Sequence, residues 1–244
     1  MIEMNKGLLG ILFCLVTVVC LSGAALATPN GADITAGSSE TAPADSPDSN
    51  EAMAGNITEL TIFGYSTTQS WQGYFGNVSG TIQLADANGN VMYNWSQVNA
   101  EGEVYAVNQS TVSWSSIECF NFTSTTELNV TGLESAYNIA SDDVDGVDET
   151  FNLNNHPAFA VGTISFNSGE CHNTKLFNNA GVGTFDEVLL YDSTNDIPVF
   201  ASILSDDTTG FNDASTDFEM LVLEDGHNGD SSTTTYYFYI ELNA

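Results

Sequence analysis

The sequence predicts an all-β protein, a β-sandwich or jelly roll of about ten antiparallel strands. Three observations predict this class. Apolar residues alternate with polar ones in many short segments, turn-forming residues separate these segments, and no stretch has the periodicity of an amphipathic helix. The clearest example is Ser70 to Trp95. Its two alternating halves flank Asn88-Gly89, a pair that readily adopts the positive φ angles of a tight turn, so we expect a half-buried hairpin there.

Further strands are expected where the alternation recurs. They are 60–63, 103–107, 111–114, 116–122, 127–130, 159–166, 187–191, 198–204, 217–223 and 234–242. The last four are expected to form two hairpins, each from consecutive strands. The stretch from Glu134 to Asn155 lacks alternation and is rich in acidic residues, so it is expected to be a long acidic loop, with at most a short helical turn and few apolar side chains to anchor it.

Three parts of the chain are expected from composition. Residues 1–27 have the features of a signal peptide: Lys6, an apolar run, and Ala25-Leu26-Ala27 as a cleavage site before Thr28. An uncleaved membrane anchor and a prepilin-type cut after Gly7 remain as alternatives. Residues 28–55 are poor in large apolar side chains and are expected to be a disordered acidic linker rich in Ser, Ala and Pro. Residues 56–244 are expected to form the β-sandwich domain, with no membrane span once the signal is cleaved.

The charge is strongly one-sided. The chain has two basic residues, Lys6 and Lys175, against 32 acidic ones, a net charge of −30. Removal of residues 1–27 takes away one Lys and one Glu and leaves this value unchanged. Such a surface repels nucleic acid and favours cations. It fits a salty or cation-rich exterior, where ions screen self-repulsion, and it equally fits a simple need for solubility.

Cys119 and Cys171 are the cysteines that remain after the signal segment. An even pair in a secreted chain predicts a disulfide, and two unpaired thiols are the alternative. The bridge would close a loop of about 52 residues and stabilise the fold by roughly 4 kcal/mol.

Sequons for N-linked glycans cluster in one part of the chain, between 56 and 131. They begin at Asn56, Asn77, Asn94, Asn108, Asn121 and Asn129. Their clustering favours covalent glycans on several of them, although Asn94 lies between aromatic residues and is expected to be less accessible. The alternative is a polar surface that matches the motif by composition.

Acidic residues crowd around Gly146. Asp142, Asp143, Asp145 and Asp148 offer carboxylate oxygens of the kind that calcium prefers. Their spacing does not match an EF-hand, so a solvated acidic loop is the alternative. Calcium is the one cofactor that the sequence suggests.

Five aromatic residues offer a platform for stacking on sugars, or else belong to the core: Trp71, Tyr74, Phe75, Trp95 and Trp114. No nucleophile elbow, zinc-protease motif, P-loop or dinucleotide fingerprint is present, so we expect a protein that is not an enzyme. Paired carboxylates of an extracellular hydrolase stay open because acidic residues are so numerous.

Three strings, Gly73-Tyr74-Phe75-Gly76-Asn77-Val78-Ser79-Gly80, Gly102-Glu103-Val104-Tyr105-Ala106 and Glu187-Val188-Leu189-Leu190-Tyr191-Asp192, resemble uncharacterised archaeal secreted and cell-surface proteins. The resemblance implies an extracellular place and carries over no catalytic residue. With the composition, it leads to the expectation of a secreted acidic glycoprotein with a structural cell-surface role. The chain would be a subunit of a surface layer or extracellular filament that assembles with itself or with other surface proteins. A carbohydrate-binding module or adhesin is the alternative.

Overall fold

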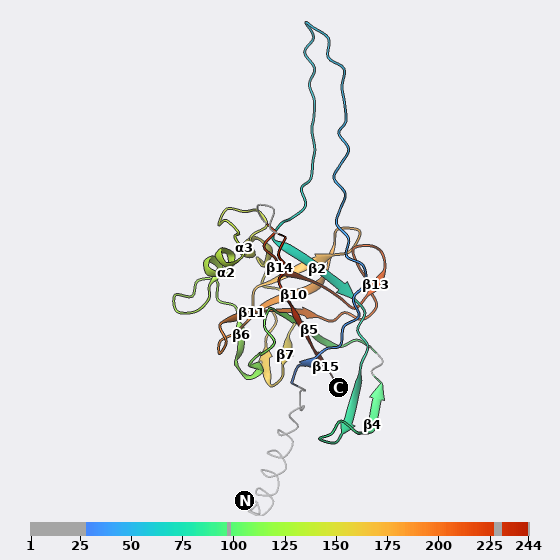
Figure 1. Ribbon diagram of the computed structural model, residues 1–244, viewed down its shortest axis with the longest axis vertical. Coiled ribbons are helices and arrows are strands. Elements are labelled where there is room, and N and C mark those ends of the chain that lie inside the picture. The colour runs from blue at the N-terminus through green and yellow to red at the C-terminus, as the bar shows by residue number, and fades with distance from the viewer. Residues whose placement is uncertain (1–27, 97–98, 227–230, 244) are drawn as a thin grey trace, which may run out of the picture.

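The chain folds into antiparallel β-sheets with few helices, which confirms the all-β class. The structure is a computed structural model, and it describes residues 28–96, 99–226 and 231–243. Fifteen mostly short strands lie in these described ranges. The expected signal peptide, residues 1–27, falls outside them. Figure 1 shows a body of crossing strands, from which a long arm leaves at one end and a hairpin at the other.

The main sheet has the strand order β1-β15-β5-β11-β10-β6, and β9 also pairs with β10. All its pairings are antiparallel. Its strands are β1 (Asn30–Gly31), β5 (Gly102–Val107), β6 (Ile117–Cys119), β9 (Asn173–Phe177), β10 (Gly183–Asp192), β11 (Ile197–Ile203) and β15 (Tyr237–Leu242). The strands β10 and β11 form the expected hairpin, and their central residues are buried on both faces of the sheet.

The other strands form two-stranded pairs: β2 (Trp71–Gly76) with β14 (Phe218–Leu223), β3 (Thr81–Ala85) with β4 (Val91–Ser96), β7 (Phe159–Val161) with β8 (Ile164–Phe166), and β12 (Thr208–Thr209) with β13 (Ser215–Thr216). The helices in the described ranges are η1 (Trp114–Ser116), α2 (Val130–Ala136) and α3 (Val147–Thr150). Asn129 begins α2 because its side chain accepts a hydrogen bond from the Gly132 backbone N–H.

The β2–β14 pair packs on one face of the main sheet and is tied to it by side chains. The buried Glu187 on β10 accepts a hydrogen bond from the Leu221 N–H, and Ser202 on β11 donates to the Glu219 carbonyl. An unpaired strand edge leaves backbone groups without partners, and here two buried side chains satisfy such groups of β14. The free edge of β14 therefore has partners for these backbone groups without a third strand beside it.

Both faces of the main sheet are buried. On one face Ala106, Leu189 and Phe200 pack with Met220 of β14 and with Phe151, next to α3. On the other face Tyr105, Leu190 and Val199 pack with Val161 and Phe166 of the β7–β8 hairpin.

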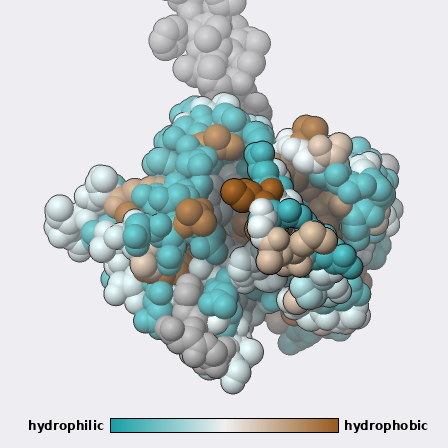
Figure 2. Space-filling view, turned by 90° about the horizontal axis from the view of Figure 1, so that it is seen from above, coloured by the Kyte–Doolittle hydropathy of each residue, from teal (hydrophilic) through white to brown (hydrophobic). Residues whose placement is uncertain are grey.

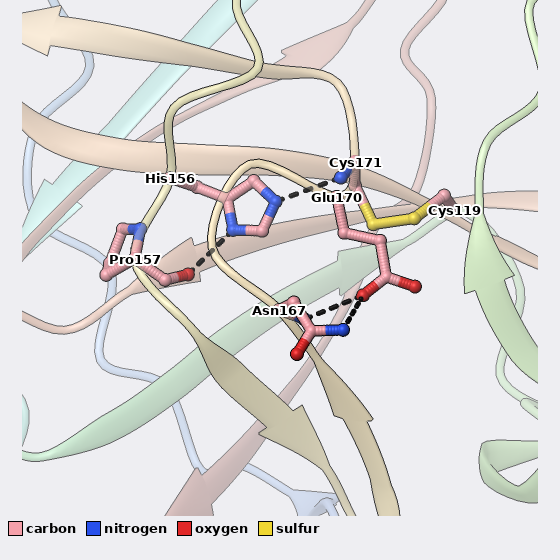
Figure 3. Close-up of a disulfide and its surroundings, with 6 residues drawn as sticks. All are labelled: Cys119, His156, Pro157, Asn167, Glu170 and Cys171. Carbon is pink, nitrogen blue, oxygen red and sulfur yellow. Dashed lines mark hydrogen bonds between the residues drawn. A yellow bond between two sulfur atoms is a disulfide. The ribbon is translucent and has the colours of Figure 1, made fainter.

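One edge of the main sheet is a strand in two pieces. Cys119 of β6 pairs with Leu190, and Asn173 of β9 pairs with Val188, so β6 and β9 lie in line along the same edge of β10. The break falls at Leu189, whose carbonyl accepts from the Phe120 N–H and whose N–H donates to the His172 carbonyl. The expected disulfide is present: Cys119 and Cys171 are bonded, with their Cα atoms 5.1 Å apart. It joins the two pieces at the break (Figure 3).

The insertion between the two pieces, residues 120–172, covers both faces of the sheet. It supplies α2 and α3 to one core and the β7–β8 hairpin to the other. Val147 and Phe151 are fully buried. The expectation that the acidic stretch has little to anchor it was therefore wrong, because its few apolar residues are the ones that pack. The short helical turn expected there is α3.

Several expected elements differ in the structure. Segment 217–223 does not pair with 234–242; β14 pairs with β2 and β15 with β5, because long-range packing overrides the order along the chain. Segments 111–114 and 127–130 are not strands, since Trp114 begins η1 and Asn129 begins α2. Segment 60–63 forms no strand and is exposed. The strand β9 was missed, since its sequence, Asn-Thr-Lys-Leu-Phe, has little alternation.

We predict that Cys119→Ser and Cys171→Ser each lower the melting temperature by roughly 10 °C. The bridge closes a loop with a separation of 52 residues, worth about 4 kcal/mol, or about 2–4 °C per kcal/mol for a domain of this size. The double variant should lose little more than either single one, because both remove the same bond. Thermal unfolding measures the losses, and peptide mapping without reductant detects the bridge. Two free thiols, or additive losses, would refute this prediction.

We predict that Glu187→Gln makes the protein more resistant to rising pH. Burial raises the pKa of Glu187 well above its ordinary 4.5, so the folded state keeps a proton that the unfolded state releases, and stability falls as pH rises above that value. Glutamine keeps an acceptor for the Leu221 N–H and cannot ionise. The melting temperature of the variant minus that of the wild type should grow by about 3 °C or more from pH 5 to pH 8. The exposed Glu118→Gln is the control; an equal trend in both variants would contradict the prediction.

Candidate functional site

The first exposed feature is a long arm, which consists of residues 33–69 between β1 and β2. Every residue in it is exposed, and it contains no helix or strand. Figure 1 shows its two limbs running out from the body and back. The expected linker 28–55 thus enters the main sheet at β1 and then becomes the outgoing limb, while residues 56–69, expected in the domain, lie in the returning limb.

The returning limb carries apolar side chains in water. Ile62 is 86% exposed and Phe63 89%, and Ile57, Leu60 and Tyr65 are exposed as well. Such β-branched and aromatic residues favour strands. The Tyr65 hydroxyl donates to the Pro43 carbonyl on the other limb at 2.9 Å. In the described chain, the backbone of residues 57–65 makes no hydrogen bond with another backbone group, so its donors and acceptors are open to a partner strand.

The β3–β4 hairpin is the second exposed feature. Ile82 pairs with Trp95 and Leu84 with Tyr93, so these four side chains share one face. Trp95 is 51% and Tyr93 59% exposed, and their rings meet edge to face with centroids 4.9 Å apart. A two-stranded hairpin alone is marginally stable in water. An uncovered apolar face on it therefore indicates a surface that a partner covers.

In the described chain, the contacts that hold the hairpin to the body lie at its base. The Val78 N–H donates to Asp217 at 2.7 Å, and Gly80 packs so closely on Leu242 that a Cβ atom would lie 2.3 Å from a Leu242 methyl carbon. The hairpin itself is where the sequence places it, but it was expected to be half-buried, and β4 is exposed along its length. Alternation predicts two faces and does not say what covers them.

The arm and the hairpin project from opposite ends of the body (Figure 1). Most of the exposed large hydrophobic residues in the described chain belong to one or the other. Seen from above, hydrophilic residues cover most of the body, and hydrophobic ones form small separate patches (Figure 2). The two projections are therefore the candidate functional surfaces.

The remaining aromatic candidates lie in or against the body. Trp71 packs against the first core and donates to the Asp145 carbonyl, and Trp114 packs between Tyr105 and Tyr239. Tyr74 and Phe75 on β2 are partly exposed and contact Phe238 and Phe211. Two of the five have an exposed aromatic neighbour: Trp95, beside Tyr93 on the hairpin, and Phe75, beside Phe211 on the body.

Among the described residues, the four aspartates proposed for calcium do not form one group of ligands. Asp145 accepts from the Thr68 hydroxyl, Asp143 accepts from the Ala140 N–H at 2.7 Å, and Asp142 is exposed. Asp148 instead lies with Glu134 and Glu149, whose carboxylate oxygens come within 4.8 Å of one another. A hydrogen bond with Asp148 raises the pKa of Glu149. Glu134 is buried and the other two acids are exposed, and the group does not by itself identify an ion.

The polar side chains around the disulfide form hydrogen bonds within the neighbouring loops (Figure 3). Nε2 of His156 accepts the Cys171 N–H at 3.0 Å, so Nδ1 carries the proton and donates to the Pro157 carbonyl. Glu170 is held by the backbone and side-chain amides of Asn167. A shallow depression beside the bridge is lined by His172, which stacks on Phe122. His156 thus orders a loop and has no arrangement suited to proton transfer.

The sequons differ in accessibility. Asn56, Asn77, Asn94 and Asn121 are exposed, so the expectation that Asn94 is less accessible was wrong. Its side chain shares the polar face of the hairpin with Gln83, away from Trp95. Asn108 and Asn129 are partly buried, and their amide nitrogens already donate to the Tyr137 hydroxyl and to the Ser124 carbonyl.

Comparisons add no relative. No protein-family model matches the chain, and no match was found among curated proteins or solved structures. Within the described residues, no helix is both long and apolar enough to cross a bilayer.

We predict that glycans, if the chain passes through a glycosylating secretory route, occupy Asn56, Asn77, Asn94 and Asn121. An exposed amide nitrogen is free to be modified, whereas a glycan on Asn108 or Asn129 would break a hydrogen bond that the fold uses. Glycopeptide mass spectrometry measures each occupancy. Higher occupancy at Asn108 and Asn129 than at the exposed four would contradict the prediction.

Proposed function

We propose that this protein is a secreted, acidic, glycosylated structural protein of the cell surface, not an enzyme, whose copies join head to tail. The returning limb of one copy pairs with the β3–β4 hairpin of the next. The observation that carries this proposal is the position of two uncovered apolar elements at opposite ends of one body.

The pairing is β-augmentation, in which an extended segment adds a strand to an exposed edge. Residues 57–65 offer open backbone groups, and the hairpin offers two open strand edges. A third strand gives a hairpin the support that two strands lack. Apolar side chains of the limb would also cover part of the face that holds Leu84, Tyr93 and Trp95.

The position of the two elements decides the form of the assembly. A contact between different patches of two copies is heterologous, and it continues into an open chain when the rotation does not close a ring. A limb and a hairpin at opposite ends suit such a chain. This supports a filament or layer more than a closed dimer.

Charge sets the conditions for assembly. Copies with a net charge of −30 repel one another, and dissolved salt shortens the range of that repulsion to about 8 Å at physiological ionic strength. Assembly should therefore strengthen with salt. Cations bound loosely to the acidic surface would act in the same direction, without a dedicated calcium site.

We predict that apolar-to-charged changes on either element weaken polymer formation. The arm variant is Ile62→Asp with Phe63→Asp, and the hairpin variant is Leu84→Asp with Tyr93→Asp. Each should raise the concentration needed for assembly at least about tenfold, which corresponds to about 1.4 kcal/mol per contact. Electron microscopy and light scattering of the purified chain at low and high salt measure it. The control is Val144→Asp. Val144 is 92% exposed and belongs to neither element.

A mixture of the two variants tests the head-to-tail arrangement. Each variant keeps one intact element, so equal amounts should form one-to-one pairs that grow no further. Polymers that persist in both variants, or a wild-type chain that stays monomeric at all salt concentrations, would refute the proposal.

A carbohydrate-binding module is the second candidate, and the exposed Tyr93–Trp95 pair favours it. Aromatic faces stack on sugar rings in such modules. Glycan-array binding that Trp95→Ala abolishes, together with a monomeric wild type, would favour this candidate over assembly.

A further inference from the structure

Two buried carboxylates face each other in the main sheet. Glu103 on β5 pairs directly with Glu241 on β15, so their side chains lie on the same face. They are 3% and 1% exposed. Both belong to the face that the β7–β8 hairpin covers, since Tyr105 and Tyr239, two residues along each strand, pack there.

The pair is only half satisfied. Glu241 accepts the Gly162 N–H at 3.1 and 2.9 Å and the Tyr105 hydroxyl at 3.3 Å. Oε2 of Glu103 is buried without a hydrogen-bond partner in the described chain. Burial and the neighbouring Glu241 raise the pKa of Glu103 to about 8, and burial raises that of Glu241. Two buried acids of like charge call for a proton or a cation.

The chain has almost no cation to offer. Lys6 lies in the predicted signal segment, and Lys175 bonds both oxygens of Asp186 at 2.7 Å. Tyr105 is the other titratable group that contacts the pair. Ile203 on β11, which pairs with Glu103, and Gly162 are uncharged. In the described chain, a counter-ion other than a bound proton would therefore come from outside the side chains that contact the pair.

Thr28 lies beside this site. A Cβ atom on Gly162, the residue whose N–H binds Glu241, would be 3.8 Å from the Thr28 Cα and 3.9 Å from its hydroxyl oxygen. With standard bond lengths added, the Thr28 Cα is at most about 9 Å from a Glu241 oxygen. The segment is held there: Asn30 and Gly31 pair with β15, Pro29 is buried, and the Asn30 side chain donates to the Thr28 carbonyl.

We propose that cleavage after Ala27 turns the Thr28 α-amino group into the counter-ion of the Glu103–Glu241 pair. A signal peptidase would hydrolyse the Ala27–Thr28 peptide bond with one water molecule. Ala27 keeps the new carboxylate, and the new amine on Thr28 takes up a proton. The resulting ammonium group binds the carboxylates beneath Gly162 and fixes β1 on β15. Processing thereby completes the core of the mature domain.

This inference rests on the proposed processing site and is independent of assembly. N-terminal sequencing of secreted protein tests the processing, with Thr28 expected first. The ion pair is tested separately on recombinant chains of two kinds: residues 28–244 with a free Thr28 amine, and the same chain preceded by Ala25-Leu26-Ala27, which moves the amine three residues away.

The first measurement is the pKa of the α-amino group. Reductive methylation with ¹³C-formaldehyde keeps the charge and labels only Thr28 and Lys175 in residues 28–244, so NMR resolves both. We expect an α-amino pKa at least one unit above the ordinary value of about 7.7–8.0. The double change Glu103→Gln and Glu241→Gln should return it toward that value, and Glu118→Gln, on the exposed side of β6, should not. A raised pKa that survives the double change would come from the overall negative charge and would overturn the proposal.

The second measurement is thermal stability at pH 7.5. The free Thr28 chain should melt roughly 5–10 °C above the extended chain, because loss of one partner leaves buried charge unpaired. The difference should disappear in the Glu103→Gln, Glu241→Gln background. It should shrink at pH 5, where Glu103 of the extended chain holds a proton, because its pKa is raised to about 8. Equal melting temperatures of the two chains at pH 7.5, or an ordinary α-amino pKa, would overturn the proposal.

Discussion

The fold depends on buried carboxylates bound by backbone N–H groups, because the chain has almost no cations to pair them with. Asp217 accepts from Val78 and Asp207, Asp192 from Ser113 and Thr194, and Glu134 from Val147. In the described ranges the single ion pair between side chains is Lys175–Asp186. Each of these acids fixes a loop or joins two layers. Hydrogen bonds from backbone N–H groups to carboxylates therefore replace the ion pairs of a protein with similar numbers of acidic and basic residues. At Glu187 and Glu103 the backbone donors are too few to compensate a buried charge. The physical alternatives there are a bound proton or a cation from elsewhere in the sequence.

The second constraint is the continuity of the main sheet. Its edge beside β10 is built from β6 and β9, and the 120–172 insertion leaves and re-enters at one residue, Leu189. The insertion sends helices to one core and the β7–β8 hairpin to the other. The Cys119–Cys171 disulfide joins the two ends of this insertion. The same hairpin presents Gly162 to Glu241, so the bridge, the second core and the acidic pair form one connected unit.

The arm and the hairpin lie outside this unit. They belong to the same chain, whose net charge is −30. In the proposed assembly, the large negative charge keeps copies apart in dilute conditions, and the apolar faces of the two elements attract them at short range. The balance between these two forces is sensitive to salt.

The sequence by itself determined the all-β class, the β3–β4 and β10–β11 hairpins, and the Cys119–Cys171 bridge, because alternation, turn-forming residues and an even cysteine pair act locally or leave one choice. Tertiary structure decided the rest. Alternation in 217–223 and 234–242 predicted the strands, but the expectation that they pair with each other was wrong, since pairing is set by which faces bury together. Strand propensity in 60–63 could not reveal an exposed limb, because exposure depends on what the body leaves uncovered. Likewise Glu103 and Glu241 are 138 residues apart and look like ordinary surface acids until β5 and β15 align them.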